Sequence, residues 1–227
     1  MTHKKDKVSI IIACKGEGEG IKRILKSLDR YSDDIIVVDG HSNDGTKEEA
    51  KKFGASFFLD NKKGRGDALK IGIRNAKGDV LVFFDADGSH ESTDIPRFVE
   101  PLLKREADLV IGSRRTGGSF DINMDFTGIV RSAGCDLLVN MVNNKFKTSL
   151  TDILFSFRAI RASTAKKLKL KSDDFGIEQE MVVACLKNGY KVLEIPSREK
   201  ARGWGESKLH TLTGIKFFLV LVKDLYL

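Results

Sequence analysis

Two aspartates separated by one alanine, Asp85 and Asp87, close a run of five apolar residues at 80–84. An uninterrupted apolar run of this length predicts a buried strand of a parallel sheet that is covered on both faces. Ligands of open α/β sheets bind outside the carboxyl ends of the strands, where both carboxylates would lie. Carboxylate oxygens at this spacing suit Mg²⁺ or Mn²⁺ bridging to a diphosphate, but Asp is also common in turns that follow strands. The pair alone therefore leaves a metal site and an acidic turn open.

Composition and charge indicate a globular protein that favours anionic partners. The 227 residues are 41% hydrophobic and 31% charged, which suits an ordinary soluble domain with a sizeable core. The net charge of +7 and the pI near 9.2 favour nucleotides, phosphorylated lipids, membrane surfaces or nucleic acid. No basic run with interleaved aromatics occurs, so we expect no nucleic-acid partner. The scattered Cys14, Cys135 and Cys185 and the polar segment 1–7 predict reduced thiols, no signal peptide and a cytoplasmic location.

Strands and helices alternate through the first half of the chain. Expected strands cover 8–14, 35–38, 56–59, 80–84 and 109–111, and expected helices cover 21–28, 46–53, 67–76 and 93–105. This alternation predicts right-handed crossovers and a mostly parallel sheet. The later elements are a helix at 128–143, an antiparallel strand at 155–160, a helix at 177–187 and a strand at 191–195. We therefore expect one α/β domain over residues 1–227, with two functional halves that meet near residue 113.

The C-terminal segment 209–227 is expected to form an amphipathic helix. Six consecutive apolar residues, Phe217–Val222, lie between Lys216 and Lys223. A spanning helix needs about 20 predominantly apolar residues, so this segment is too short to cross a bilayer. It can pack on the domain, join a dimer, or lie in the membrane interface with its lysines at the headgroups. The sequence leaves these alternatives and the oligomeric state open.

Six short motifs follow one another in the chain. They are Val37-Val38-Asp39-Gly40-x-Ser42-x-Asp44-Gly45-Thr46, Asn61-x-x-Gly64-x-Gly66-x-Ala68, Asp85-Ala86-Asp87, Gly112-Ser113-Arg114, Thr151-Asp152 with Ser156-Phe157-Arg158, and Gly203-x-x-x-Ser207-Lys208-Leu209. With them the chain resembles the family-2 inverting glycosyltransferases of GT-A fold, and most of all the polyprenyl-phosphate (dolichol-phosphate) sugar synthases. The resemblance runs from Val8 to about Leu209. It departs from the family at Ala13-Cys14-Lys15-Gly16-Glu17, where the usual motif is Pro-x-Tyr-Asn-Glu, and at Ser89, where a glutamine is frequent.

The resemblance implies a GT-A fold, a Rossmann-like and mostly parallel sheet sandwiched by helices, with a small antiparallel portion on the acceptor side. It implies a UDP- or GDP-linked sugar donor bound by residues 8–113 with Mg²⁺ or Mn²⁺, and an acceptor bound by residues 114–208. The expected metal ligands are Asp85, Asp87 and Ser89. The expected donor-binding residues are Glu17, Asp39, Arg65, Asp85 and Asp87. The expected catalytic residues are Asp87, Arg114 and Asp152.

Basic residues in the second half point to a phosphate on the acceptor. The candidates for binding it are Arg114, Arg131, Arg158, Arg202 and Lys208. The planar guanidinium donates bidentate hydrogen bonds that match phosphate. A phosphate monoester is already anionic at neutral pH, whereas a sugar hydroxyl needs a general base, which contributes about 10²–10⁴-fold. Asp152, Glu178 and Glu180 are the carboxylates available as a base, and Asp152 could instead orient an arginine.

The preferred interpretation is sugar transfer with inversion to a polyprenyl or dolichyl phosphate, by an enzyme peripheral on the cytoplasmic face of the membrane. Transfer to a saccharide hydroxyl remains an alternative. A sugar-phosphate nucleotidyltransferase would share the sheet and the acidic site. However, the glycine-rich segment 15–20 carries acids where phosphates would bind, which counts against that enzyme. A non-enzymatic basic module that binds membranes or nucleic acid would explain the charge but not the two acids that close a buried strand.

Overall fold

A seven-stranded sheet forms the centre of the computed structural model, which describes residues 7–32, 34–119, 126–205 and 213–226. In these residues the strand order is β3-β2-β1-β4-β6-β5-β7. The strands are β1 (Val8–Cys14), β2 (Asp34–Asp39), β3 (Ser56–Leu59), β4 (Val80–Asp85), β5 (Leu109–Ser113), β6 (Arg158–Arg161) and β7 (Val192–Pro196). Only the pairs that β6 makes with β4 and β5 are antiparallel. The expected mostly parallel α/β sheet is confirmed.

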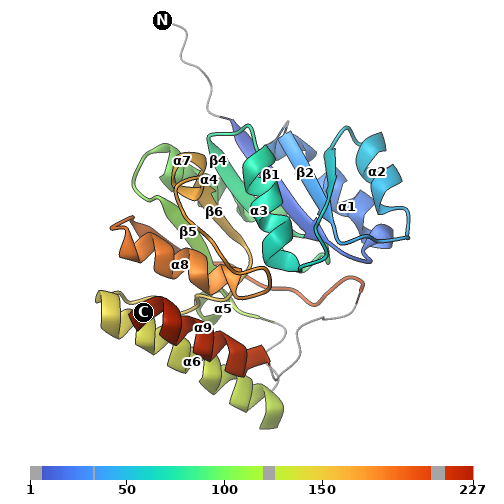
Figure 1. Cartoon of the computed structure of the whole chain (residues 1–227). Coiled ribbons are helices and arrows are strands. Elements are labelled where there is room, and N and C mark those ends of the chain that lie inside the picture. The colour runs from blue at the N-terminus through green and yellow to red at the C-terminus, as the bar shows by residue number, and fades with distance from the viewer. Residues whose placement is uncertain (1–6, 33, 120–125, 206–212, 227) are drawn as a thin grey trace, which may run out of the picture.

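Helices cover both faces of this sheet (Figure 1). They are α1 (Gly18–Leu28), α2 (Thr46–Lys52), α3 (Arg65–Asn75), α4 (Ile95–Leu103), α5 (Arg114–Gly117), α6 (Phe126–Phe146), α7 (Ala162–Ala165), α8 (Ile177–Lys187) and α9 (Thr213–Tyr226), with short 3₁₀ turns at Asp29–Tyr31 and Ser92–Asp94. Apolar residues of α1, α2 and α4 pack on one face, and those of α3, α6, α8 and α9 pack on the other. Because β4 is buried on both faces, its apolar run shows no polar alternation.

The register of the parallel strands brings the acidic residues to one edge. Cys14 pairs with Asp39 on β2, and the preceding residue, Ala13, pairs with Asp85 on β4. The carboxyl ends of β1, β2 and β4 therefore lie side by side, as expected for the ligand-binding edge of an open α/β sheet.

The antiparallel strand of the second half is shorter than the sequence predicts. It begins at Arg158, which pairs with Phe83 of β4 and Ile111 of β5. We expected its start at Phe155, but the Phe155 carbonyl accepts hydrogen bonds from the Arg158 guanidinium at 3.2 and 2.5 Å. The chain before Arg158 is thus a compact turn that enters the antiparallel strand.

Helix α9 packs against α6 and α8 (Figure 1). Its residues Phe217, Leu221 and Leu225 are buried in the core, and the side chain of Gln179 donates to the Phe217 carbonyl at 2.9 Å. The opposite face exposes apolar side chains, including Leu219 with 62% of its surface accessible. Within the described residues, the helices are all too short or too polar to cross a membrane. Core packing therefore accounts for one face of α9.

Candidate active site

Asp85, the last residue of β4, has both carboxylate oxygens engaged. Its Oδ1 accepts from Arg65 Nη2 at 2.6 Å, and its Oδ2 accepts from the Ser156 hydroxyl at 2.6 Å. Burial would raise the pKa of Asp85, but the charge of Arg65 and these hydrogen bonds outweigh it and hold the pKa well below its usual range. Asp85 is therefore a carboxylate at neutral pH.

Arg65, the first residue of α3, connects this aspartate to the second half of the chain. Its Nε donates to Glu178 Oε1 at 2.7 Å, and Glu178 is 113 residues away near the start of α8. Burial would lower the pKa of Arg65, but the carboxylates of Asp85 and Glu178 raise it. One buried guanidinium thus joins two acidic groups from opposite halves of the domain.

Asp87 lies in the turn after β4 and has different partners. Its Oδ1 accepts from the Ser89 backbone N–H at 2.9 Å and from the Ser89 hydroxyl at 2.7 Å. Its Oδ2 lies 3.1 Å from Nη2 of Arg202, a side chain with 36% of its surface accessible. The turn needs Gly88 at φ 81°, a conformation that side chains with a Cβ rarely adopt.

Segment 197–205 lies against this turn and donates hydrogen bonds to it. Lys200 donates its backbone N–H to the Ser89 carbonyl at 2.9 Å, and Gly203 donates to the Asp87 carbonyl at 2.9 Å. Trp204 Nε1 donates to the Ala86 carbonyl at 2.8 Å. These bonds bring Arg202 to Asp87, so this part of the site depends on a loop instead of a packed helix.

The oxygen atoms at this edge suit a hard divalent cation. The described residues contain no group of three or more His, Cys, Asp or Glu side chains arranged to hold a metal by themselves. However, Mg²⁺ is usually bound through one or two carboxylates together with substrate phosphates and water. A carboxylate oxygen has two lone pairs, so the hydrogen bonds to Asp85 and Asp87 leave positions for a cation. The residues present fit a metal that arrives with a diphosphate.

The two other expected donor-binding acids also lie at this edge. Asp39 accepts from the Ser42 backbone N–H at 2.7 Å and from the Ser42 hydroxyl at 2.5 Å, which holds the loop after β2. Glu17 precedes α1 and is buried, and its carbonyl accepts from the N–H groups of Gly20 and Ile21 at 2.9 Å. Their contact with a nucleotide remains a prediction.

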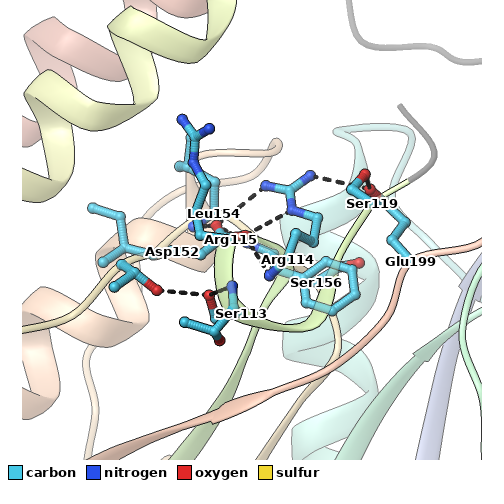
Figure 2. Close-up of polar contacts among 12 residues, drawn as sticks. Ser113, Arg114, Arg115, Ser119, Asp152, Leu154, Ser156 and Glu199 are labelled. Carbon is cyan, nitrogen blue, oxygen red and sulfur yellow. Dashed lines mark hydrogen bonds and ion pairs between the residues drawn. The ribbon is translucent and has the colours of Figure 1, made fainter. Parts of the chain in front are cut away.

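In the second half of the chain, Arg114 is held by Asp152 (Figure 2). Its Nε donates to Asp152 Oδ2 at 2.7 Å and its Nη2 donates to Oδ1 at 3.1 Å, while Nη1 lies 3.7 Å from Glu199. The Asp152 carboxylate also accepts from the N–H groups of Leu154 and Phe155 at 3.1 Å. Burial would raise the pKa of Asp152, but the charge and hydrogen bonds of Arg114 and the N–H group of Leu154 lower it. Asp152 orients Arg114 in this structure.

The structure argues against one expected phosphate ligand. Arg158 is only 1% accessible, and its guanidinium donates to the backbone carbonyls of Ile153, Phe155 and Glu178. Burial among carbonyls lowers its pKa to about 10. Because these carbonyls hold Arg158 inside the domain, its guanidinium is not available to a phosphate, contrary to the expectation from the sequence. The expectations for Lys208 and for the side chain of Arg131 lie outside what the structure describes.

Sequence reasoning missed three residues near Asp85 and Asp87. Glu178 was considered only as a possible base, but it pairs with Arg65. His90 and Ser156 both contact Asp85, although one follows β4 and the other precedes β6. Their position in or beside the quoted motifs was the available signal. It did not show which way their side chains point.

Comparisons with known proteins show the family to which the chain belongs. A family model described as glycosyl transferase family 2 matches residues 9–168. The chain is 34% identical over 188 residues to an undecaprenyl-phosphate mannosyltransferase of Micrococcus luteus, covering 78% of this chain and 75% of the relative. It is 30% identical over 213 residues to a dolichol-phosphate mannosyltransferase of Pyrococcus furiosus, covering 89% of this chain and 59% of the relative.

A solved structure supports the fold. Glucosyl-3-phosphoglycerate synthase from Mycobacterium tuberculosis, in complex with Mn²⁺, UDP and glucosyl-3-phosphoglycerate, superposes with a TM-score of 0.78 over 97% of this chain and 80% of that one, at 18% identity. The fold is therefore the GT-A fold, as expected. The family match covers more than half of the sequence, so the chain belongs to glycosyl transferase family 2.

Proposed function

We propose that this glycosyltransferase moves a sugar from a UDP- or GDP-linked donor to a polyprenyl phosphate, with inversion at the anomeric carbon. The relatives named for undecaprenyl phosphate and dolichol phosphate support a lipid-phosphate acceptor. The edge that carries Asp39, Asp85 and Asp87 is the proposed donor site, and the surroundings of Arg114 are the proposed acceptor site.

The observation that carries the proposal is the engagement of the carboxylates that could serve as a base. Asp152 is bound to Arg114, and its lowered pKa makes it a weak proton acceptor. Glu178 is bound to Arg65, and Glu180 accepts from the backbone N–H groups of Lys171 and Ser172 at 2.6 and 2.8 Å. A sugar hydroxyl would need one of these groups as a base. A phosphate is already anionic and needs an orienting cation, which Arg114 supplies.

In the proposed donor site, the residues that would hold a cation allow the charge of the leaving group to be neutralised. Asp85, Asp87 and Ser89 would hold Mg²⁺ or Mn²⁺, which when bound neutralises the charge that develops on the departing diphosphate. Arg202 pairs with Asp87 in this structure and lies on an accessible loop. If Asp87 held the cation, the Arg202 guanidinium would be free to pair with an anionic group of either substrate.

The exposed side of α9 supports a peripheral membrane location. Phe218, Leu219 and Tyr226 are exposed on α9, and Lys145 of α6 places its ammonium 4.9 Å from the centre of the Tyr226 ring. Exposed apolar side chains with neighbouring lysines suit the interface of an anionic bilayer. The free thiols of Cys14, Cys135 and Cys185 support a location on the cytoplasmic face.

The decisive experiment is a donor screen against a short-chain polyprenyl phosphate, with nucleoside diphosphate release and glycolipid mass as readouts. We expect transfer from one nucleotide sugar, loss of transfer in EDTA, and recovery with Mg²⁺ or Mn²⁺. The matching free polyprenol should not react, because it lacks the phosphate that Arg114 would bind. The same preparation should sediment with anionic liposomes, and a Leu219→Asp variant should sediment less.

Several outcomes would contradict the proposal. Equal transfer to free polyprenol or to a saccharide would remove the phosphate from acceptor recognition. Full activity in excess chelator would remove the metal. Unchanged sedimentation of the Leu219→Asp variant would place the membrane contact on another surface.

A further inference from the structure

His90 is a buried histidine beside the proposed metal site that the transfer reaction does not use directly. Its side chain is fully buried. The ring stacks on Phe157 at a centroid distance of 4.9 Å and meets the edges of Phe84 and Phe155 at 5.2 Å. An imidazole in such an apolar place must satisfy both ring nitrogens within the protein. The partners of these nitrogens indicate what the residue does.

The hydrogen bonds of His90 begin and end at Asp85. The backbone N–H of Asp85 points at Nδ1, 3.2 Å away. Because an amide N–H can only donate, Nδ1 accepts and the ring proton is on Nε2. Nε2 therefore donates to the Ser156 hydroxyl at 3.1 Å, and that hydroxyl donates its own proton to Asp85 Oδ2 at 2.6 Å.

These hydrogen bonds form a closed ring that runs from the backbone of Asp85 through the side chains of His90 and Ser156 to the Asp85 carboxylate. The accepting role of Nδ1 defines a neutral ring that carries its proton on Nε2. Since Nε2 must donate, the lone pair of Ser156 receives it and the hydroxyl proton is directed to Oδ2. This ring of hydrogen bonds holds Oδ2 of Asp85, while Arg65 holds Oδ1 at 2.6 Å.

We propose that His90 is a positioning residue, which acts through Ser156 to hold the Asp85 carboxylate in the orientation that binds the metal-linked diphosphate of the donor. The inference rests on the proposed function, because it takes Asp85 as a metal ligand. Groups that orient the ligands of a metal change its affinity by about 10–100-fold when they are removed. A ring that only filled space among Phe84, Phe155 and Phe157 would be replaceable by phenylalanine without such a loss.

The test measures UDP and GDP binding by calorimetry, with and without Mg²⁺, for the full chain and its variants. His90→Phe keeps the aromatic packing and removes both hydrogen bonds, and Ser156→Ala removes only the middle link. We expect each variant to lower Mg²⁺-dependent nucleotide affinity about 10–100-fold and to leave the Mg²⁺-independent affinity nearly unchanged. The double variant should bind nucleotide no more weakly than either single variant, because both substitutions break the same ring of hydrogen bonds.

Two further variants make the result specific. His90→Gln carries an N–H that can reach Ser156, so it should restore part of the lost affinity. Ser27→Ala removes a hydroxyl that donates to the Ile24 carbonyl within α1, and it should bind like the wild type. Thermal melting identifies variants that fail to fold, and if His90→Phe is one of them, Ser156→Ala still tests the link.

The possible results separate this inference from the proposed function. If wild-type nucleotide binding does not respond to Mg²⁺, the metal in the proposed function is wrong. If the wild type responds, and folded His90→Phe and Ser156→Ala bind within twofold of it, the function stands and the role of His90 is wrong. Losses that multiply in the double variant would also overturn the inference, because they would show two independent effects.

Discussion

Asp85 and Asp87 are two residues apart, yet they belong to regions of the site with different kinds of support. The inner region around Asp85 is held by Arg65 of α3 and, through it, by Glu178 of α8, two helices packed in the core. The outer region around Asp87 is held by Arg202 from a loop. The Arg65 guanidinium cannot leave Asp85 without disturbing the packing of these helices, whereas the Arg202 guanidinium can leave Asp87. If Asp87 held a divalent ion, we would expect Arg202 and not Arg65 to give up its carboxylate partner.

The largest expected effect comes from comparing Asp85→Asn with Asp87→Asn. Removing one member of a buried ion pair leaves an uncompensated charge, so Asp85→Asn should lower the free energy of unfolding by about 3 kcal/mol. Asp87→Asn keeps an acceptor for Ser89 and releases Arg202 toward water, so its loss should stay below about 1 kcal/mol. Urea unfolding followed by circular dichroism measures both.

Nucleotide binding should respond to both substitutions despite this difference in stability. Each variant removes one proposed metal ligand, so both should lose Mg²⁺-dependent affinity for UDP or GDP in calorimetry. Equal destabilisation by the two substitutions would show that the inner and outer regions are not supported differently.

The ion pair between Arg114 and Asp152 resembles the inner region because its carboxylate is buried, so the stability that it contributes should depend on pH. The folded-state pKa of Asp152 is lowered, so the carboxylate contributes stability above its unfolded pKa of about 3.9 and loses it as the pH falls through the folded value. Asp152→Asn should therefore be about 2 kcal/mol less stable than the wild type at pH 7, and this difference should shrink below about pH 4. Denaturant unfolding at pH 7, 5 and 3 measures it.

An exposed ion pair provides the control for this pH dependence. Glu49 and Lys52 of α2 lie 2.7 Å apart at the surface, so Glu49→Gln should show a much smaller difference at every pH. A stability difference for Asp152→Asn that does not change with pH would mean that the charge of Asp152 is not what stabilises the fold.

The sequence predicted the position of Asp85 better than the contacts that hold it in place. The uninterrupted apolar run of β4 placed Asp85 at the carboxyl end of a central strand, because strand burial is encoded locally. The ion pair between Arg65 and Glu178 joins residues 113 positions apart and depends on how α8 docks, which no local pattern encodes. Arg158 was assigned to phosphate from its motif and the chemistry of arginine. Its carbonyl partners come together only once the turn at 153–157 has folded and α8 has docked with Glu178.

The outer region was the least predictable part of the site. Trp204 carried no signal of its own, yet two glycines distant in sequence make room for its indole. A Cβ built on Gly20 would lie 1.6 Å from the Trp204 ring, and one on Gly88 would lie 2.9 Å from it. This docking anchors the loop that brings Arg202 to Asp87.

The smallest expected effect is a change in the fluorescence of Trp204, the single tryptophan of the chain. If a metal-linked nucleotide releases Arg202 from Asp87, the indole two residues away should shift, so Mg²⁺ with UDP or GDP should change its emission. Gly20→Ala should move the emission to longer wavelength without ligand, because the added methyl displaces the ring toward water. Asp87→Asn should show no nucleotide-induced change. Arg202→Ala should show a reduced one, because its loop is already released. Calorimetry establishes nucleotide saturation. An unchanged wild-type spectrum at saturation would mean that Arg202 stays on Asp87 and that both regions of the site are equally fixed.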